Sequence, residues 1–174
     1  MKKILFVTLL SISALVVNAQ FVLTPKDGLK TDENVYTIKR TGTELENYQA
    51  AKNAVKAVIP NAVIEEPEFE KVFTAKAEAL IKTKVAGWSL TLAGAYTIKI
   101  ETDKDKILIS YVELGMLKNT GKRDIVLYPS SGVNTIMSPF YVFNSSGDLR
   151  QKKAKASIEE WANSLVHQIE ESLK

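Results

Sequence analysis

Two alternating runs near the middle of the chain constrain its fold most. Residues 96–101 (Tyr-Thr-Ile-Lys-Ile-Glu) and 107–112 (Ile-Leu-Ile-Ser-Tyr-Val) are rich in β-branched and aromatic residues, which favour strands. The charged segment 103–106 lies between them and is short enough to be the turn of a hairpin. The chain is therefore predicted to contain an antiparallel sheet.

Further strands are predicted upstream of this hairpin. Residues 35–39 alternate and favour a first strand, which Thr41 and Gly42 end. Residues 74–84 are rich in helix formers, but their apolar residues recur with period two, with Thr83 as the one polar exception on the apolar side. Because pattern outweighs propensity where one face is buried, this segment is also predicted to be a strand. Residues 62–64 are a candidate short strand.

Two helices are predicted. The first runs from Glu44 to about Ile59: Thr43 and Glu46 form a capping box, and Pro60 ends the helix. The second runs from about Asp148 to Leu173. Each carries apolar residues at helical spacing, which predicts one face turned toward a core. These residues are Leu45, Tyr48, Ala51, Val55, Val58 and Ile59 in the first helix, and Ala154, Ile158, Trp161, Ala162, Leu165, Ile169 and Leu173 in the second.

The order of elements is strand, helix, several antiparallel strands, helix. This order predicts an α+β fold, in which two helices pack on one face of a twisted antiparallel sheet. Residues 20–33 are interpreted as a lead-in with turns. Residues 115–147 are irregular, and within them 125–128 and 140–143 are candidate strands. Residues 20–174 are predicted to form a single domain.

The first nineteen residues have the pattern of a secretory signal peptide. Lys2 and Lys3 precede a mostly apolar run, and residues 17–19 (Val-Asn-Ala) offer a cleavage site. This run is too short to span the hydrocarbon core of a membrane, and no later run of about 18 apolar residues follows. The sequence therefore predicts cleavage after Ala19, a periplasmic or secreted location and no integral membrane span.

The composition excludes several classes of function. The chain has 23 basic and 20 acidic residues, and loss of Lys2 and Lys3 with the signal leaves 21 against 20, a net charge of +1. This balance argues against a nucleic-acid partner, which requires a concentrated basic patch. The chain contains no cysteine, so disulfides, thiolate catalysis and cysteine-ligated metals are excluded. Core burial has to hold the domain together.

The pattern resembles a bacterial exported domain of unknown function that is described as having a TATA-binding-protein-like fold. The matching features are residues 35–39 leading into the 44–59 helix, the strand ending in Ile-Lys-Thr-Lys at 81–84, the 96–111 hairpin, and the terminal helix with Trp161. The resemblance covers most of residues 33–173. It implies the fold, and it carries no catalytic residues and no cofactor.

The charged and titratable side chains that could carry chemistry are interpreted as facing solvent and not as catalytic. His167, the only histidine, lies about 200° around the helix from Leu165 and is predicted to face away from the core. The remaining clusters are Glu65, Glu66, Glu68 and Glu70 around Pro67, Glu101, Asp103 and Asp105 near the hairpin turn, and Lys152, Lys153 and Lys155. The first is interpreted as a solvent-facing loop, the second as a solvated turn without the pattern of a calcium loop, and the third as a solvated basic face. No catalytic residue, metal ligand or cofactor is predicted.

Aromatic residues in the irregular region form the candidate contact surface. Tyr128, Phe140, Tyr141 and Phe143 lie among glycines and prolines, and loops of this kind often carry binding surfaces. Core packing is the competing interpretation. Two functions stay open: a non-enzymatic binding module of the cell envelope, with an envelope protein or a small ligand as partner, or a small periplasmic enzyme of hydrolase type.

Overall fold

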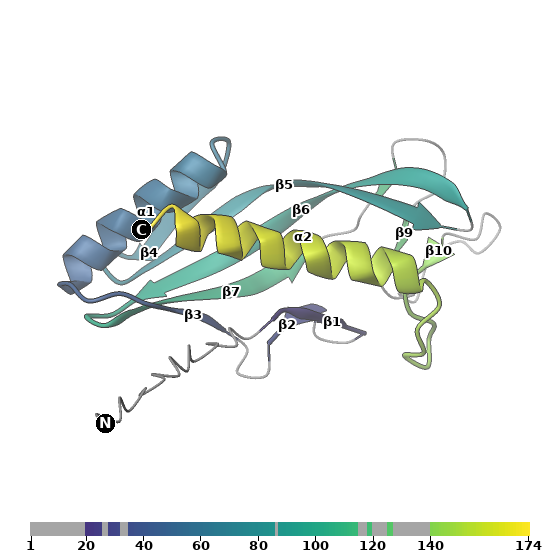
Figure 1. Ribbon diagram of the computed structural model, residues 1–174, viewed down its shortest axis with the longest axis horizontal. Helices are drawn as coiled ribbons and strands as arrows, with labels where there is room; N and C mark the ends of the chain where they lie inside the picture. Colours follow the sequence, from purple (N-terminus) through teal and green to yellow (C-terminus); the bar gives the residue numbers. More distant parts are fainter. Residues whose placement is uncertain are drawn as a thin grey trace, which may run out of the picture.

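The computed structural model describes residues 20–25, 28–31, 35–85, 87–114, 118–119, 125–126 and 140–174. Figure 1 shows two helices lying in front of a sheet of long strands. In chain order the elements are β1 (Val22–Thr24), β2 (Gly28–Lys30), β3 (Tyr36–Lys39), α1 (Glu44–Val58), β4 (Val63–Glu68), β5 (Val72–Val85), β6 (Trp88–Thr102), β7 (Lys106–Leu114), β8 (Lys118–Asn119), β9 (Ile125–Val126), β10 (Phe140–Tyr141) and α2 (Lys152–Glu171).

The main sheet has the strand order β3-β7-β6-β5-β4, and β8 also pairs with β6. All of these pairings are antiparallel. Strands β5 and β6 form the longest hairpin, in register from Val72 opposite Glu101 to Val85 opposite Trp88. Gly87 in its turn has φ +85°, a conformation that glycine adopts without strain. The predicted 96–112 hairpin is confirmed as part of β6 and β7.

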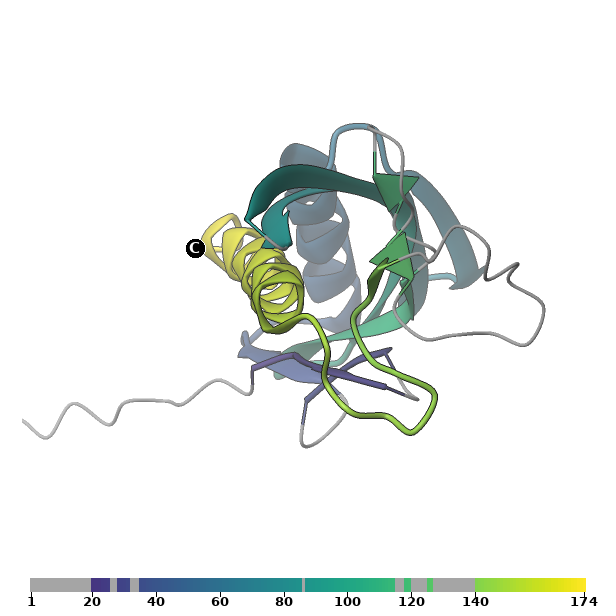
Figure 2. The ribbon, with the colours of Figure 1, turned by 90° about the vertical axis from the view of Figure 1, so that its right-hand side faces the viewer.

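Both helices pack on the same face of this sheet, which confirms the predicted α+β architecture. Figure 2 shows the sheet curving so that the helices lie on its concave side. The alternation in β5 turns Phe73, Ala75, Ala79 and Ile81 toward the helices, where all four are buried. The α2 stripe meets them with Ala154, Ile158, Ala162, Leu165, Val166 and Ile169, also buried. No helix in the described part of the chain has the length and apolar character needed to cross a membrane.

Helix α1 confirms the predicted capping box. The Thr43 hydroxyl accepts a hydrogen bond from the Glu46 N–H at 3.2 Å, and the Glu46 carboxylate accepts one from the Thr43 N–H at 2.8 Å. The prediction that Leu45 faces the core is wrong, because its side chain is 44% exposed. At 100° per residue, Leu45 lies about 120° around the helix from the centre of the buried set Asn47, Tyr48, Ala51, Ala54 and Val55.

Helix α2 begins at Lys152, four residues later than predicted. Residues 144–150 form a turn instead, in which the Asn144 side-chain oxygen accepts hydrogen bonds from the N–H groups of Ser146 and Asp148. Gly147 in this turn has φ +88°. Asparagine often organises its following backbone in this way, and the arrangement competes with helix formation.

Three other segments differ from the sequence-based expectation. The lead-in at 20–33 contains the β1–β2 hairpin, which buries Phe21, Leu23 and Leu29. Strand β6 begins at Trp88, eight residues before the predicted strand at Tyr96. The acidic segment around Pro67 is the edge strand β4 and not a loop, and its register shifts between Glu65 and Glu68. Proline has no N–H to donate to a neighbouring strand. An edge strand tolerates this because one of its sides has no neighbour.

Candidate functional site

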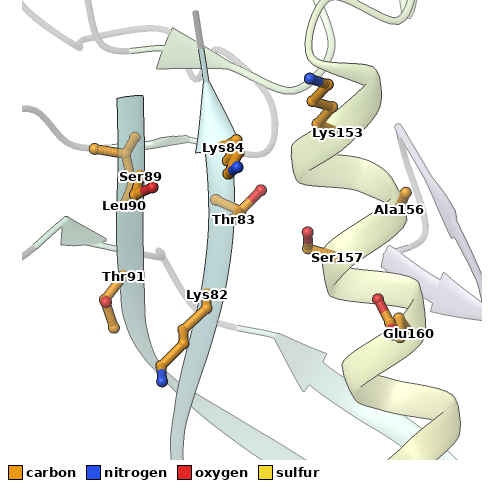
Figure 3. A pocket seen from close by; sticks show the side chains of 10 residues that line it. All are labelled: Lys82, Thr83, Lys84, Ser89, Leu90, Thr91, Lys153, Ala156, Ser157 and Glu160. Atoms are coloured by element: carbon orange, nitrogen blue, oxygen red, sulfur yellow. The ribbon is translucent and has the colours of Figure 1, made fainter. Parts of the chain in front are cut away.

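A groove lies between α2 and the end of the β5–β6 hairpin nearest Gly87. It has a volume of about 560 Å³. Figure 3 shows the side chains that line it. Two strands supply one wall, with Lys82, Thr83 and Lys84 from β5 and Ser89, Leu90 and Thr91 from β6; α2 supplies Lys153, Ala156, Ser157 and Glu160.

The strand wall presents one buried hydroxyl. Alternation along β5 places Thr83 on the same side as Ile81, facing α2, and Leu90 lies opposite it in register on β6. The Thr83 side chain is 6% exposed, yet its Oγ1 has no hydrogen-bond partner. Lys82 and Lys84 alternate to the other side of the strand and are exposed, and Figure 3 shows the Lys82 amine pointing away from α2. These two lysines flank the groove.

The helix wall presents polar groups at one-turn intervals. Lys153, Ser157 and Glu160 lie four and three residues apart, which places them on one face of α2. In Figure 3 the hydroxyls of Thr83 and Ser157 extend from opposite walls into the gap between strand and helix. Lys153 lies at one end of this gap and Glu160 lies at the other.

Positive charge gathers around the groove. Lys82 and Lys84 flank it from the other side of β5, Lys153 and Glu160 lie on its helix wall, and none of these four groups forms an ion pair with the described residues. The first turn of α2 contains no acidic residue, and Gln151 makes no capping hydrogen bond with its side chain. The partial positive charge of a helix N-terminus adds to that of the lysines. This end of the molecule therefore offers hydrogen-bond donors and positive potential.

Of the four residues predicted as a contact surface, only Phe143 has a described side chain, and it is not among the residues that line this groove. Phe143 is 4% exposed and belongs to the core, which agrees with the competing interpretation of core packing for this residue. Its burial follows from the bridge to Leu149, which folds residues 144–148 back as a turn. Phe140 and Tyr141 are the two residues of strand β10, which pairs in parallel with β9. Tyr128 lies outside the described residues.

His167 faces away from the core, as predicted. Its side chain is 65% exposed, with Nδ1 3.5 Å from the Glu170 carboxylate and Nε2 3.9 Å from that of Glu171. Ten residues of α2 separate it from Ser157, a distance of about 15 Å along the helix axis. The histidine therefore lies well away from the groove.

One member of the acidic cluster is held by hydrogen bonds to α1. The Glu66 carboxylate accepts hydrogen bonds from the Lys52 amine and from the Tyr48 hydroxyl, which joins edge strand β4 to α1. These two hydrogen bonds hold the pKa of Glu66 below its usual value, and burial together with Glu66 raises the pKa of Tyr48 to about 12. Glu65 and Glu68 are exposed. Through Glu66, this cluster helps to hold edge strand β4 against α1.

Three of the other charged groups that the sequence singled out, Glu101, Asp103 and Lys155, are also engaged structurally. Glu101 pairs with Lys99 at 2.7 Å, and the Asp103 carboxylate accepts a hydrogen bond from the Lys104 N–H within the hairpin turn. Lys155 forms an ion pair with Glu159 one turn further along α2. Among the described residues, no three His, Asp or Glu side chains are grouped to hold a metal ion.

Sequence reasoning missed the groove although one signal pointed to it. Thr83 is the only polar residue on the apolar side of the β5 alternation. A threonine there can be a tolerated core residue with a satisfied hydroxyl, and the pattern alone does not separate that case from a site. Lys153 stands out in the sequence only as part of a basic run. The juxtaposition of the two residues depends on α2 packing along β5.

Comparisons with known proteins identify a structural neighbour. No protein-family profile matches the sequence, and no curated protein is similar to it. Among solved structures, the fold is similar to that of a DUF4468 family protein from Bacteroides ovatus ATCC 8483, with a TM-score of 0.57 and 11% sequence identity. The similarity covers 83% of this chain and 88% of the other. At this identity it shows a shared fold with a member of a family of unknown function.

Proposed function

We propose that this protein is an exported cell-envelope protein with a TATA-binding-protein-like fold, and that it acts as a non-enzymatic binding module through the groove between β5, β6 and α2. The observation that carries the proposal is Thr83, whose buried hydroxyl lines the groove and has no partner. An unsatisfied buried hydroxyl costs about 1–3 kcal/mol. A ligand that accepts a hydrogen bond from it would offset that cost.

Export is supported by the signal pattern and by the residues directly after it. The exposed Gln20 comes immediately after the proposed cleavage site, and the next residue, Phe21, is fixed on α2. The Phe21 N–H donates to Asn163 Oδ1 at 2.7 Å, and Asn163 Nδ2 donates to the Phe21 carbonyl at 3.0 Å. A similar fold does not carry DNA binding with it, because function depends on the site.

A binding role fits the chemistry of the groove better than catalysis does. The groove contains lysines, hydroxyls and a single carboxylate, and His167 lies about 15 Å away along α2. A nucleophile activated by a general base requires a hydrogen bond between the two groups, and among the described residues the Thr83 hydroxyl makes no hydrogen bond to a lysine or to Glu160. The volume of about 560 Å³ falls within the range of about 300–1,000 Å³ that is typical of small-molecule sites.

The binding proposal is tested by filling the groove. Ala156 is exposed on α2 and lines the groove, so Ala156→Trp should block it without disturbing the core. Native mass spectrometry after incubation with the small-molecule fraction of a host envelope extract should show an adduct for the unmodified protein and none for this variant. Ala57→Trp places the same side chain at an exposed site on α1 and should keep the adduct. An adduct that survives Ala156→Trp, or none with any protein, contradicts the proposal.

Export has its own test. N-terminal sequencing of the protein purified from its native host should begin at Gln20. An intact Met1 on protein from the cytoplasmic fraction would contradict export and leave the groove proposal to its separate experiment.

A further inference from the structure

We infer that the groove binds the oxyanion group of a small ligand, a phosphate or a carboxylate, between Thr83, Ser157 and Lys153. This inference rests on the proposed function and specifies its ligand class. Figure 3 shows the two hydroxyls extending from opposite walls and the lysine at one end of the gap. An oxyanion offers several acceptor positions, and this arrangement supplies two O–H donors and an ammonium group for them.

The first observation is the orientation of the Thr83 hydroxyl. Neighbours at the same side of β5, such as Ala79 and Ile81, are apolar and buried, so a valine at position 83 would suit this side of the strand. The chain instead has a hydroxyl with an unpartnered oxygen that faces α2 across the groove. The hydroxyl of Ser157, on the other wall, makes no hydrogen bond with the described residues either. Both hydroxyls therefore lack a hydrogen-bond partner that an acceptor on a ligand would supply.

The second observation is the charge at the start of α2. Lysines in the first turn of a helix are unfavourable, because the N-terminus already carries partial positive charge. Lys155 is neutralised by Glu159, but Lys152 and Lys153 have no ion-pair partner among the described residues. Gln151 leaves the helix end without a side-chain cap. A bound anion would compensate this uncapped, positively charged helix end.

The third observation limits the ligand. Glu160 lies at the far end of the groove, where it would repel a second anionic group and accept a hydrogen bond from a hydroxyl or an amine. The described residues that line the groove include no arginine. The anion would therefore contact the ammonium group of Lys153 and not a guanidinium group that donates two parallel hydrogen bonds. The walls also include Leu90 and Ala156. The ligand is therefore expected to carry one anionic group at the Lys153 end and neutral polar or apolar atoms beyond it.

The inference is tested with inorganic phosphate and with acetate as separate probes. Each salt is titrated at constant ionic strength against sodium chloride, and the amide signals of Thr83, Lys153 and Ser157 are followed by NMR. Saturable shifts with phosphate, acetate or both are expected, with none from chloride. The stronger of the two probes identifies the oxyanion. No saturable shift with either anion would overturn the inference.

Matched variants assign the effect to the groove. Thr83→Val and Lys153→Gln should each weaken anion binding about tenfold or more, because a hydrogen bond to a charged group contributes at least that much. The controls Thr97→Val, on the opposite face of β6, and Lys39→Gln, on edge strand β3, should leave it unchanged. Binding that survives both groove variants would overturn the inference.

Two further measurements distinguish a ligand-binding hydroxyl from a structural one, and a soluble ligand from a membrane. The unfolding midpoint of Thr83→Val in urea without anion should equal or exceed that of the unmodified protein, because no hydrogen bond is lost; a lower midpoint would mean that the hydroxyl is structural. Sedimentation with phosphatidylglycerol vesicles, compared with phosphatidylcholine vesicles, tests a membrane source: vesicle binding without binding of either soluble anion would overturn a small-ligand site.

If a neutral envelope ligand is lost in Ala156→Trp but neither anion binds, the proposed function stands and this inference falls.

Discussion

The two helices begin in opposite ways. Helix α1 has a complete capping box, and Glu44 and Glu46 lie in its first turn, where negative charge is favourable. Helix α2 has no side-chain cap and no acidic residue in its first turn, and Lys152 and Lys153 are there instead. The start of α1 is built for stability. The start of α2 lacks this stabilisation, and it lies beside the groove that α2 forms with β5 and β6.

The two ends of β5 differ in the same way. Near α1, Phe73 is fully buried and packs edge-on against Tyr48, with 5.5 Å between the ring centroids. Near the start of α2, Thr83 lies on the same side of the strand with an unpartnered hydroxyl. One strand therefore runs from a closed core to an open groove. Apolar side chains close the first end by packing, whereas the second end has a buried hydroxyl beside the groove.

The largest expected effect is at the closed end. Phe73→Ala should lower the free energy of unfolding by about 3–5 kcal/mol, because it removes a buried ring and leaves a cavity against Tyr48. Leu90→Ala, in the half-buried groove wall, should cost less than half as much. Urea unfolding of the two variants measures both values. Equal losses would mean that the two ends are packed alike and would break the comparison.

A buried amide at the closed end should give the next largest effect. Asn47 is fully buried and donates hydrogen bonds to the carbonyls of Arg40 at 3.1 Å and Asp103 at 2.6 Å, which ties α1 to the ends of β3 and β6. Asn47→Ala should cost about 2–3 kcal/mol, because both carbonyls lose a partner. Asn53→Ala, at an exposed position of the same helix, should change the unfolding midpoint little. A similar loss in both variants would contradict the role of Asn47.

The helix starts should respond to mutation with opposite signs. Thr43→Ala removes the α1 cap and should destabilise the protein by about 1 kcal/mol, whereas Gln151→Asp supplies a cap at α2 and should stabilise it by about 0.5–1 kcal/mol. Thermal unfolding followed by circular dichroism measures both. If the oxyanion inference holds, Gln151→Asp should also weaken phosphate binding by placing negative charge near the groove. A destabilising Gln151→Asp would show that the start of α2 is not suboptimal.

The smallest expected effect is a pH dependence confined to the closed end. Hydrogen bonds from Lys52 and Tyr48 lower the pKa of Glu66 in the folded protein. A lowered folded pKa stabilises the protein above the ordinary glutamate value of 4.5, and this contribution is lost as the pH falls through the folded value. Unfolding curves between pH 7 and pH 3 should therefore show a shallower acid-side loss for Glu66→Gln. An unchanged slope would mean that Glu66 is paired equally in the unfolded chain.

Most of the secondary structure could be predicted because local patterns encode it. The capping box at Thr43 and Glu46, the alternation in β5 and the apolar stripe of α2 each lie within a short window of sequence. Two of the errors came where long-range contacts decided the outcome. Residues 20–33 look like a lead-in, but they contain β1 and β2, which pair with each other. Hydrogen bonds between Asn163 and Phe21 and the burial of Leu23 and Leu29 hold this part of the chain against the rest of the domain. Phe143 looks like a loop aromatic, but the bridge to Leu149 places it in the core.

The sequence by itself determined the α+β class, one helix before and one after the long strands in chain order, and the outward position of His167, because periodicity and capping depend on neighbours along the chain. Only the tertiary structure decided where a site could form. Thr83 and Ser157 are 74 residues apart in sequence, and each alone resembles an ordinary residue of its strand or helix. The packing of α2 along β5 brings them to opposite walls of one groove. Whether a buried hydroxyl finds a partner depends on every atom around it, and no local pattern specifies those atoms.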